Sequence, residues 1–207
     1  MTARGILSLA VNAAIFIAVF ATWLRMALKV DESGMLTAAG LRSLKYFTVL
    51  SNLLQGGASL AYVIALPSGG VPPGLRVVRY AATASVLLTF ATTALYLGPI
   101  YGMGKMFRGV NLWFHLIVPL AAALDFALLD PTGPVPFAAS FAALVPMALY
   151  AAGYVANLLV HAPGEGRDAA DWYAFLRRGW AGGGVIAAVL VLGTWGMALL
   201  LRLVRGG

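Results

Sequence analysis

The 207-residue chain contains no cysteine, only two histidines and few charged residues. The absence of cysteine excludes disulfides, thiolate metal ligands and a cysteine nucleophile. Two histidines without an HExxH pattern argue against a metal enzyme, and we expect no metal and no cofactor. Charged residues make up 10% of the chain, against about 25% in a typical soluble domain. The low charge content indicates a membrane protein.

The charge that is present is mostly basic, with 14 Lys and Arg residues against seven Asp and Glu residues. The basic residues stand singly or in pairs between apolar runs, and no cluster of roughly five to eight could follow a phosphate backbone. This pattern argues against nucleic-acid binding. It is typical of the charges that orient a membrane protein in the bilayer.

Six apolar runs have the length of about 20 residues that spans a bilayer as a helix. We therefore expect an all-α integral membrane protein, a single domain over 1–207 whose six transmembrane helices form a bundle. A short interfacial helix, rich in aromatic residues, is expected over 170–180, before the last span. The six spans are predicted at 5–28, 44–66, 79–98, 110–129, 136–160 and 182–203.

These spans divide the basic residues between the two sides of the membrane. The loops after spans one, three and five carry Arg25, Lys29, Arg42, Lys45, Lys105, Arg108, Arg167, Arg177 and Arg178. The opposite side carries Arg4, Arg76, Arg79, Arg202 and Arg205. Because cytoplasmic loops carry an excess of Lys and Arg, we expect the first side to be cytoplasmic and both termini to lie outside.

A polar stripe interrupts the second span. Its members fall within an arc of roughly 100° when successive residues are placed about 100° apart around a helix. They are Thr48, Ser51, Asn52, Gln55 and Ser59. Hydroxyls are common in membrane helices as packing groups, but two amides in one span are costly unless a network satisfies them. Because lipid offers no hydrogen-bond partner, we expect the stripe to face the protein interior or a water-filled cavity.

The fourth predicted span contains His115, one of the two histidines. Spans two and four run in the same direction, so Thr48 and His115 both lie roughly 6–8 Å below the same membrane boundary, at about 1.5 Å per residue. This depth permits a hydrogen bond between them if the two helices are neighbours. A threonine hydroxyl becomes a nucleophile when a base takes its proton, and imidazole can do this near neutral pH.

Acyl transfer through such a pair requires donors for the developing oxyanion. The candidates for this role, or for lining a polar cavity, lie within two turns of Thr48 or His115. They are Ser51, Asn52, Gln55 and Asn111. The sequence alone does not choose among them.

A carboxylate that orients the imidazole would complete a catalytic triad. Asp125 is ten residues from His115, about 15 Å along the same helix, and is too distant for a direct hydrogen bond. We expect it to pair instead with Arg79, at the start of the third span. Asp168 and Asp171, in the last loop, stand on the side of His115.

Two segments resemble a known family of membrane proteins. Residues 45–55 (KYFTVLSNLLQ) look like the second-helix motif of the androgen-induced-protein family, which includes the androgen-dependent TFPI-regulating protein and bacterial six-helix relatives. Residues 112–119 (LWFHLIVP), followed by 124–126 (LDF), are similar to its histidine segment, and the bacterial branch is the closer match. The resemblance implies a multi-pass hydrolase that cleaves fatty acid esters of hydroxy fatty acids, with Thr48 as nucleophile and His115 as the essential histidine.

We therefore expect a serine/threonine-type carboxylic ester hydrolase that forms an acyl-threonine intermediate and takes a lipid or fatty-acyl ester from the membrane. The resemblance to bacterial members implies the bacterial cytoplasmic membrane, and the loop charges place the site toward its cytoplasmic side. One alternative is a small-molecule carrier or channel lined by the polar stripe, although halves 1–98 and 99–207 share no evident repeat. Another is a non-catalytic membrane partner protein. The oligomeric state stays open.

Overall fold

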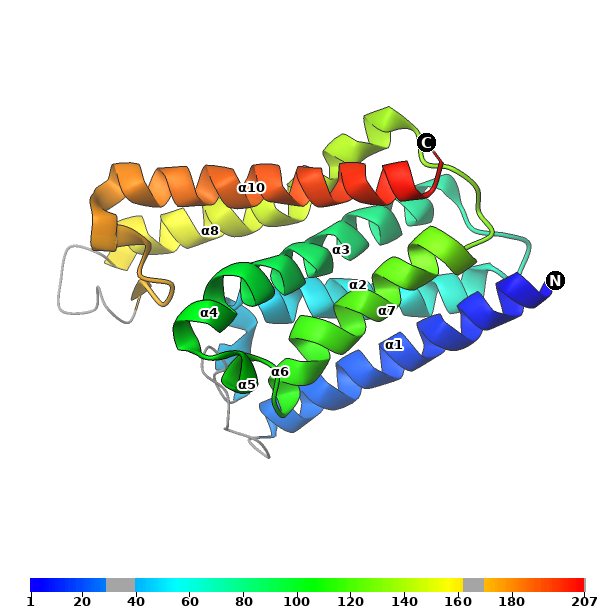
Figure 1. Ribbon diagram of the computed structural model, residues 1–207, viewed down its shortest axis with the longest axis horizontal. Helices are drawn as coiled ribbons and strands as arrows, with labels where there is room; N and C mark the ends of the chain where they lie inside the picture. Colours follow the sequence, from blue (N-terminus) through cyan, green and yellow to red (C-terminus); the bar gives the residue numbers. More distant parts are fainter. Residues whose placement is uncertain (29–39, 162–169, 207) are drawn as a thin grey trace.

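A computed structural model describes residues 1–28, 40–161 and 170–206, and every regular element in these ranges is a helix. Six helices are long and apolar enough to cross a membrane, which confirms the expected six-helix membrane bundle. They are Ala3–Ala27, Phe47–Ala65, Pro73–Tyr101, Val110–Leu129, Phe137–His161 and Gly179–Val204. Both termini lie at the same end of the bundle (Figure 1).

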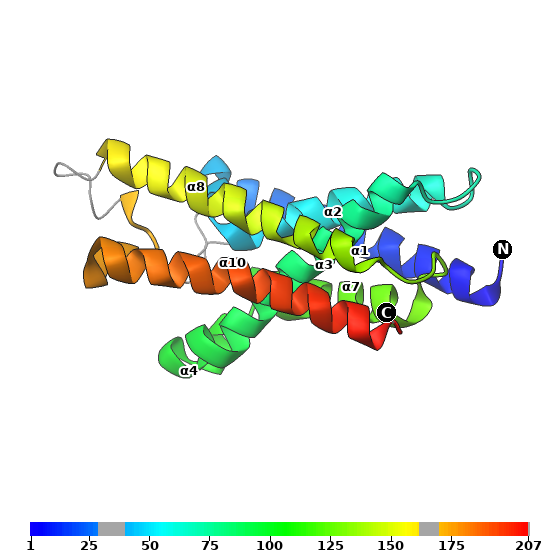
Figure 2. The ribbon, with the colours of Figure 1, turned by 90° about the horizontal axis from the view of Figure 1, so that it is seen from above.

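Three of the spans are continuous α-helices: α1 (Ala3–Ala27), α2 (Phe47–Ala65) and α10 (Gly179–Val204). The third span comprises α3 (Pro73–Thr92), a π-turn at Thr93–Leu97 and α4 (Gly98–Tyr101). The fourth comprises α6 (Val110–Leu112), a π-turn at Trp113–Ile117, α7 (Val118–Leu124) and a π-turn at Asp125–Leu129. The fifth begins as a 3-10 helix, Phe137–Ala143, and continues as α8 (Leu144–His161). Seen from above, α4 diverges from the other helices (Figure 2).

The π-turn in the fourth span and the proline that follows it leave one backbone carbonyl without a donor from its own helix. In this turn the Val118 N–H donates to the Trp113 carbonyl, five residues earlier, instead of to Phe114. The next residue, Pro119, has no N–H to donate. The Phe114 carbonyl therefore receives a hydrogen bond neither from Val118, four residues later, nor from Pro119, five residues later. This oxygen is left for a donor from outside the helix.

The predicted span boundaries are correct to within a few residues, with one exception. The third helix was expected to begin at 79 and begins at Pro73. Proline suits the first turn of a helix because its fixed φ is helical and its missing N–H is not needed there. Arg76 and Arg79 consequently lie on α3, and Arg79 is buried, with only 2% of its surface exposed.

The short helix expected over 170–180 is a single 3-10 turn, Phe175–Arg178. Asp171 organises this turn by accepting two backbone N–H groups, from Phe175 and Leu176, at 2.8 Å each. Its carboxylate also accepts the Tyr154 hydroxyl of α8 at 2.6 Å. The aromatic side chains therefore pack against α8 as part of the bundle.

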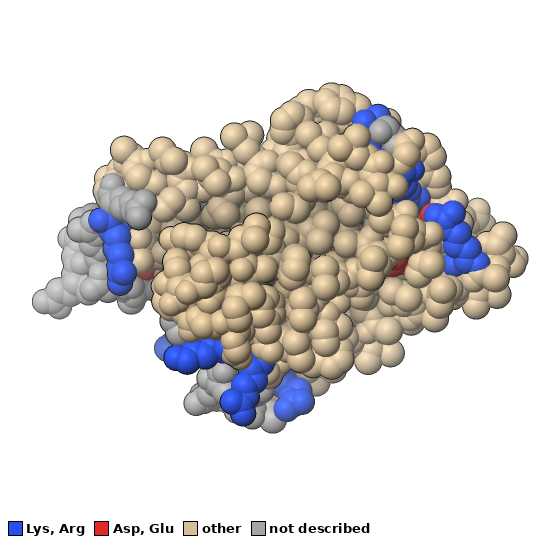
Figure 3. Space-filling model, in the orientation of Figure 1, with Lys and Arg blue, Asp and Glu red and all other residues tan. Residues whose placement is uncertain are grey.

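Two further features support insertion in a bilayer. Lys and Arg side chains gather at the two ends of the molecule, and the face shown between them is nearly free of charge (Figure 3). Inside the bundle, α1 and α2 approach closely at Gly56, where an added Cβ would lie 2.9 Å from Val19 Cγ1. Small residues at helix contacts are typical of membrane bundles, because close backbone approach maximises packing there.

Candidate active site

The polar stripe of α2 faces the protein interior, as its periodicity predicts. Four members are at most 1% exposed: Ser51, Asn52, Gln55 and Ser59. Thr48, in the first turn of the helix, is half-buried. Two members contact α3, where Ser51 Oγ lies 3.3 Å from Thr89 Oγ1 and the Thr83 hydroxyl donates to Gln55 Oε1 at 3.2 Å. Part of the hydrogen-bonding capacity of the stripe is therefore used by side chains of α3.

Asn52 joins α2 to the histidine segment. Its Nδ2 donates to the Thr48 carbonyl at 2.7 Å and to the Phe114 carbonyl at 3.1 Å. The second acceptor is the oxygen that the π-turn and Pro119 leave without a backbone donor, so Asn52 completes the hydrogen bonding of the adjacent span. Because both acceptors are carbonyls, only the nitrogen side of the amide can face them, and its orientation is fixed.

His115 follows Phe114 in the same π-turn and is only 2% exposed. Its Nδ1 lies 3.1 Å from the carbonyl oxygen of Met106. A carbonyl can only accept a hydrogen bond, so the neutral ring carries its proton on Nδ1 and its lone pair on Nε2. A backbone carbonyl thus fixes the tautomer of the imidazole here, which is the role of the carboxylate in a catalytic triad.

The Met106 carbonyl is positioned by a short segment between two unusual glycines. Met106 ends the helix α5 (Met103–Met106) and is completely buried. Gly102 has a φ of 97°, and Gly109 has a φ of 58° with a ψ of −134°. Residues with a Cβ are strained in these conformations. The glycines therefore allow the chain to turn twice and return α5 to the ring of His115.

Thr48 and His115 do not form the hydrogen bond that their depth in the membrane permits. The helices that carry them are neighbours, as the depth argument required, and they are linked through the Asn52–Phe114 hydrogen bond. However, the hydrogen bonds among the described residues include none between the Thr48 hydroxyl and the His115 ring, which is turned toward Met106. The structure therefore brings the two spans together without a hydrogen bond between the two reactive groups in the described part of the chain.

Two of the three carboxylates considered from the sequence have partners other than His115. Asp171 organises the turn before α10, as described above, and Asp168 lies outside the described residues. Asp125 pairs with Arg79 at 2.7 Å, which confirms the predicted ion pair. None of the three is seen to orient His115 in the parts of the chain that the structure describes.

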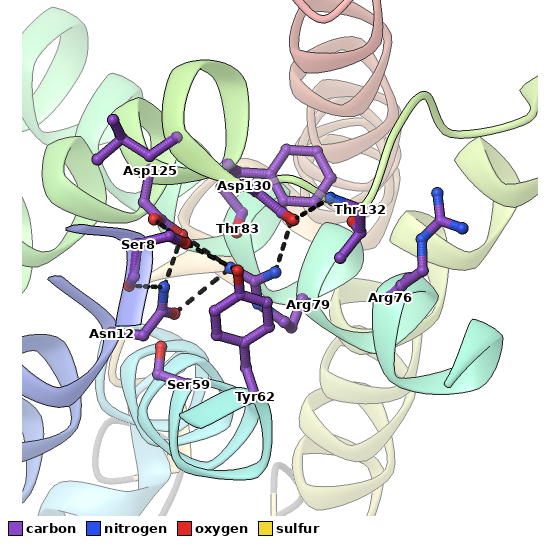
Figure 4. A network of polar contacts seen from close by, with 12 residues as sticks. Ser8, Asn12, Ser59, Tyr62, Arg76, Arg79, Thr83, Asp125, Asp130 and Thr132 are labelled. Carbon is purple, nitrogen blue, oxygen red and sulfur yellow. Dashed lines mark hydrogen bonds and ion pairs between the residues drawn. The ribbon is translucent and has the colours of Figure 1, made fainter. Parts of the chain in front are cut away.

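The Arg79–Asp125 pair belongs to a larger buried network at the end of the bundle opposite His115 (Figure 4). Arg79 also contacts Asp130 at 2.6 Å, and Arg205 of the last helix contacts Asp130 at 3.2 Å. The formal charges of these two arginines and two aspartates cancel. Burial alone would raise the pKa of Asp130, but Arg79 and Arg205 hold it below its usual value.

Neutral groups complete this network. Ser8 Oγ and Asn12 Nδ2 of α1 donate to the two oxygens of Asp125 at 2.6 and 2.7 Å. The Arg79 guanidinium lies over the ring of Tyr62, 3.6 Å from its centroid. The sequence reasoning missed these partners, although two polar residues four apart in the first apolar run were a visible signal.

A groove of about 290 Å³ lies on the outer surface between α2 and α8. It is lined by Phe47, Leu50, Ser51, Leu54, Pro146, Leu149 and Tyr150. All but Ser51 and the hydroxyl of Tyr150 present apolar atoms, and Leu149 is 69% exposed. Since the groove lies on membrane-spanning helices, it faces the acyl chains of the bilayer.

No family model, curated protein or solved structure matches this chain. Within the described ranges no three His, Asp or Glu side chains are grouped so that they could hold a metal ion. The chemistry assigned to the site therefore depends on its own residues and geometry.

Proposed function

We propose that the protein is an intramembrane threonine hydrolase that cleaves fatty acid esters of hydroxy fatty acids or similar acyl esters. Thr48 is the nucleophile and His115 the general base. The observation that carries the proposal is the hydrogen bond between His115 Nδ1 and the Met106 carbonyl, which leaves Nε2 as the basic nitrogen of a ring on the span that Asn52 links to α2. The resemblance of residues 45–55 and 112–119 to the androgen-induced-protein family supports the same two residues.

In the proposed mechanism His115 Nε2 takes the proton of the Thr48 hydroxyl as its oxygen attacks the ester carbonyl carbon. The tetrahedral intermediate collapses, the alcohol leaves with the proton from His115, and an acyl-threonine remains. Water then attacks this ester with His115 again as base, which releases the carboxylic acid and restores the Thr48 hydroxyl. Catalytic hydrogen bonds commonly tighten only in the substrate complex, so their absence without substrate does not contradict the mechanism.

The groove between α2 and α8 supports a substrate that arrives from the bilayer. Phe47 and Ser51, which precede and follow Thr48 by one and three residues, both line it. An acyl chain in the groove would lie among apolar side chains without leaving the lipid phase. We place the site toward the cytoplasmic side of a bacterial cytoplasmic membrane, following the excess of basic residues at this end.

Hydrolysis by the purified protein in detergent tests this proposal, with a fatty acid ester of a hydroxy fatty acid as substrate. We expect turnover by the wild type and a loss of at least about 100-fold in Thr48→Ala and His115→Ala, because each removes a group that acts in the chemical step. Equal turnover in the three proteins contradicts the mechanism.

The chain offers a matched control for each substitution. The Thr194 hydroxyl donates to the Leu190 carbonyl within α10 at 2.9 Å, far along the chain from the site. His161 ends α8, where its Nδ1 lies 2.9 Å from the Asn157 carbonyl and its side chain is exposed. Thr194→Ala and His161→Ala are therefore expected to retain the wild-type rate.

The interruptions of the third and fourth spans favour one alternative, a small-molecule carrier, because carriers place binding sites at discontinuous helices. Against it, the buried stripe of α2 is bonded to α3 and to the fourth span. A carrier predicts uptake into proteoliposomes that survives Thr48→Ala. A non-catalytic partner protein predicts neither uptake nor hydrolysis.

A further inference from the structure

The three amides near the proposed site differ in whether their N–H groups are free. Both N–H bonds of Asn52 are directed at backbone carbonyls, as described above. The Gln55 amide lies a turn deeper, where its Nε2 donates to Ser59 Oγ at 3.1 Å. Asn111 is 1% exposed, and its Nδ2 has no hydrogen-bond partner in the described part of the chain.

Four uncharged side-chain groups at the His115 end each carry a buried atom without a hydrogen-bond partner in the described part of the chain. Apart from the Nε atoms of three arginines, the described residues contain four such side-chain atoms. They are Trp23 Nε1, Ser43 Oγ, Asn52 Oδ1 and Asn111 Nδ2. α1, α2 and the 3-10 helix Gly40–Lys45 contact one another, and α6 contributes Val110 to the same hydrophobic core, which includes Tyr46 and Phe114. Buried polar groups without a partner are rare in native proteins and point to a missing water or ligand.

From this arrangement, and resting on the proposed function, we propose that Asn111 is the oxyanion donor of the hydrolase. Asn111 stands one helical turn before His115, so its amide and the imidazole project from the same side of the fourth span. It is the one amide of the three whose nitrogen is buried and unpartnered, and oxyanion stabilisation requires a donor held ready in a site that excludes water. The Asn111 N–H donates to the ester carbonyl oxygen as the Thr48 oxygen bonds to the carbonyl carbon and that oxygen becomes negative.

The neutral character of this donor indicates the chemistry that it recognises. The unpartnered side-chain atoms of this cluster belong to an indole, a hydroxyl and two amides, none of which carries a charge. Such a set suits the carbonyl of a neutral ester, which acquires its charge only in the transition state. Asn111 thus stabilises the transition state more than the bound substrate, and its removal lowers kcat with little change in KM.

The test compares Asn111→Ala, Asn111→Asp and Asn111→Ser with wild type in the hydrolysis assay. Removal of one oxyanion donor typically lowers kcat by about 10²- to 10³-fold, so we expect this loss in the Ala and Asp variants with KM changed less than about threefold. Serine retains a donor and should recover at least about tenfold over alanine. An acyl trifluoromethyl ketone forms an oxyanion when the Thr48 oxygen adds to its carbonyl carbon. Its affinity for each Asn111 variant should fall by the same factor as kcat. An unreactive amide of the same chain should bind all variants equally.

Asn157→Ala is the matched control, because Asn157 Nδ2 donates to the Ala170 carbonyl at 3.2 Å in the turn beyond α8. This variant should keep the wild-type kcat. If Asn111→Ala also keeps it while Thr48→Ala is inactive, the assignment of Asn111 is wrong and the hydrolase remains. If wild type and Thr48→Ala are equally inactive, the proposed function fails and the assignment fails with it. If Asn111→Ala does not fold, the Asn111→Ser and Asn111→Asp variants test the assignment instead. The ratio of their affinities for the trifluoromethyl ketone and for the unreactive amide then shows whether Asn111 binds the oxyanion.

Discussion

The Arg79 end and the His115 end of the bundle differ in how their buried polar atoms are paired. At the Arg79 end both oxygens of Asp125 and both of Asp130 accept hydrogen bonds, and the charges of the two arginines and two aspartates cancel. At the His115 end four buried atoms have no partner among the described residues, and none of the groups that carry them is charged. The unpartnered buried atoms at the Arg79 end are the Nε atoms of Arg76, Arg79 and Arg202. A charge-paired network stabilises the fold, whereas unused hydrogen-bonding capacity in neutral groups lowers stability and is retained where a ligand must bind.

Replacing Arg79 by leucine should break the charge-paired network most severely. The change leaves Asp125 without an arginine partner and Asp130 with Arg205 alone, and an uncompensated buried charge lowers the free energy of unfolding by about 3–5 kcal/mol. Thermal or chemical unfolding in detergent measures the loss. The double variant Arg79→Leu, Asp125→Asn restores neutrality and should be more stable than Arg79→Leu alone. A single variant as stable as wild type would contradict the network's structural role.

The same serine-to-alanine change should have opposite effects at the two ends. Ser8 donates to an ionised Asp125, and loss of such a bond lowers stability by about 1.5–3 kcal/mol. Ser43 Oγ is buried and has no partner among the residues that the structure describes, so Ser43→Ala should leave stability unchanged or raise it by about 1 kcal/mol. Unfolding midpoints of both variants under one condition make the comparison. Equal destabilisation would show that the two ends do not differ as described.

Acid should loosen the Arg79 end gradually. The folded-state pKa of Asp130 is held below its usual value, so its contribution to stability is complete above about pH 4. The contribution is lost as the pH falls through the lowered folded-state pKa, with a slope of at most about 1.4 kcal/mol per pH unit. Unfolding midpoints between pH 7 and pH 3 should show this slope. In Asp130→Asn the midpoint should be lower at pH 7, and it should change less with acid.

The sequence predicted those features that depend on length and periodicity alone. Six spans follow from the thickness of the bilayer, and the inward direction of the α2 stripe follows from the cost of polar groups in lipid. The Arg79–Asp125 pair followed from depth, because both residues lie near the same end of adjacent spans. The start of α3 was wrong because two consecutive prolines suggest a loop, yet the second also suits a helix N-terminus.

Features that depend on how distant segments meet were not predictable. The Met106 carbonyl reaches His115 because two glycines turn the chain on either side of α5. The amino-acid sequence predicts neither the backbone angles of these glycines nor the contact that results. Asp130 gains Arg205 only because the end of α10 returns to the loop after the fourth span. The hydrogen bond from Asn52 to the Phe114 carbonyl likewise depends on the π-turn, which no hydrophobic pattern predicts.

That π-turn also affects how this chain should be aligned with relatives. A π-turn holds one more residue than the α-turn it replaces, so the stretch between Asn111 and Pro119 contains one residue that an uninterrupted helix would not need. A relative that lacks one residue of this stretch would present its histidine roughly 100° around the helix from the position of His115, even where the remaining residues match. The position of a single alignment gap, more than the identity of the residues, would then decide whether two histidines are equivalent.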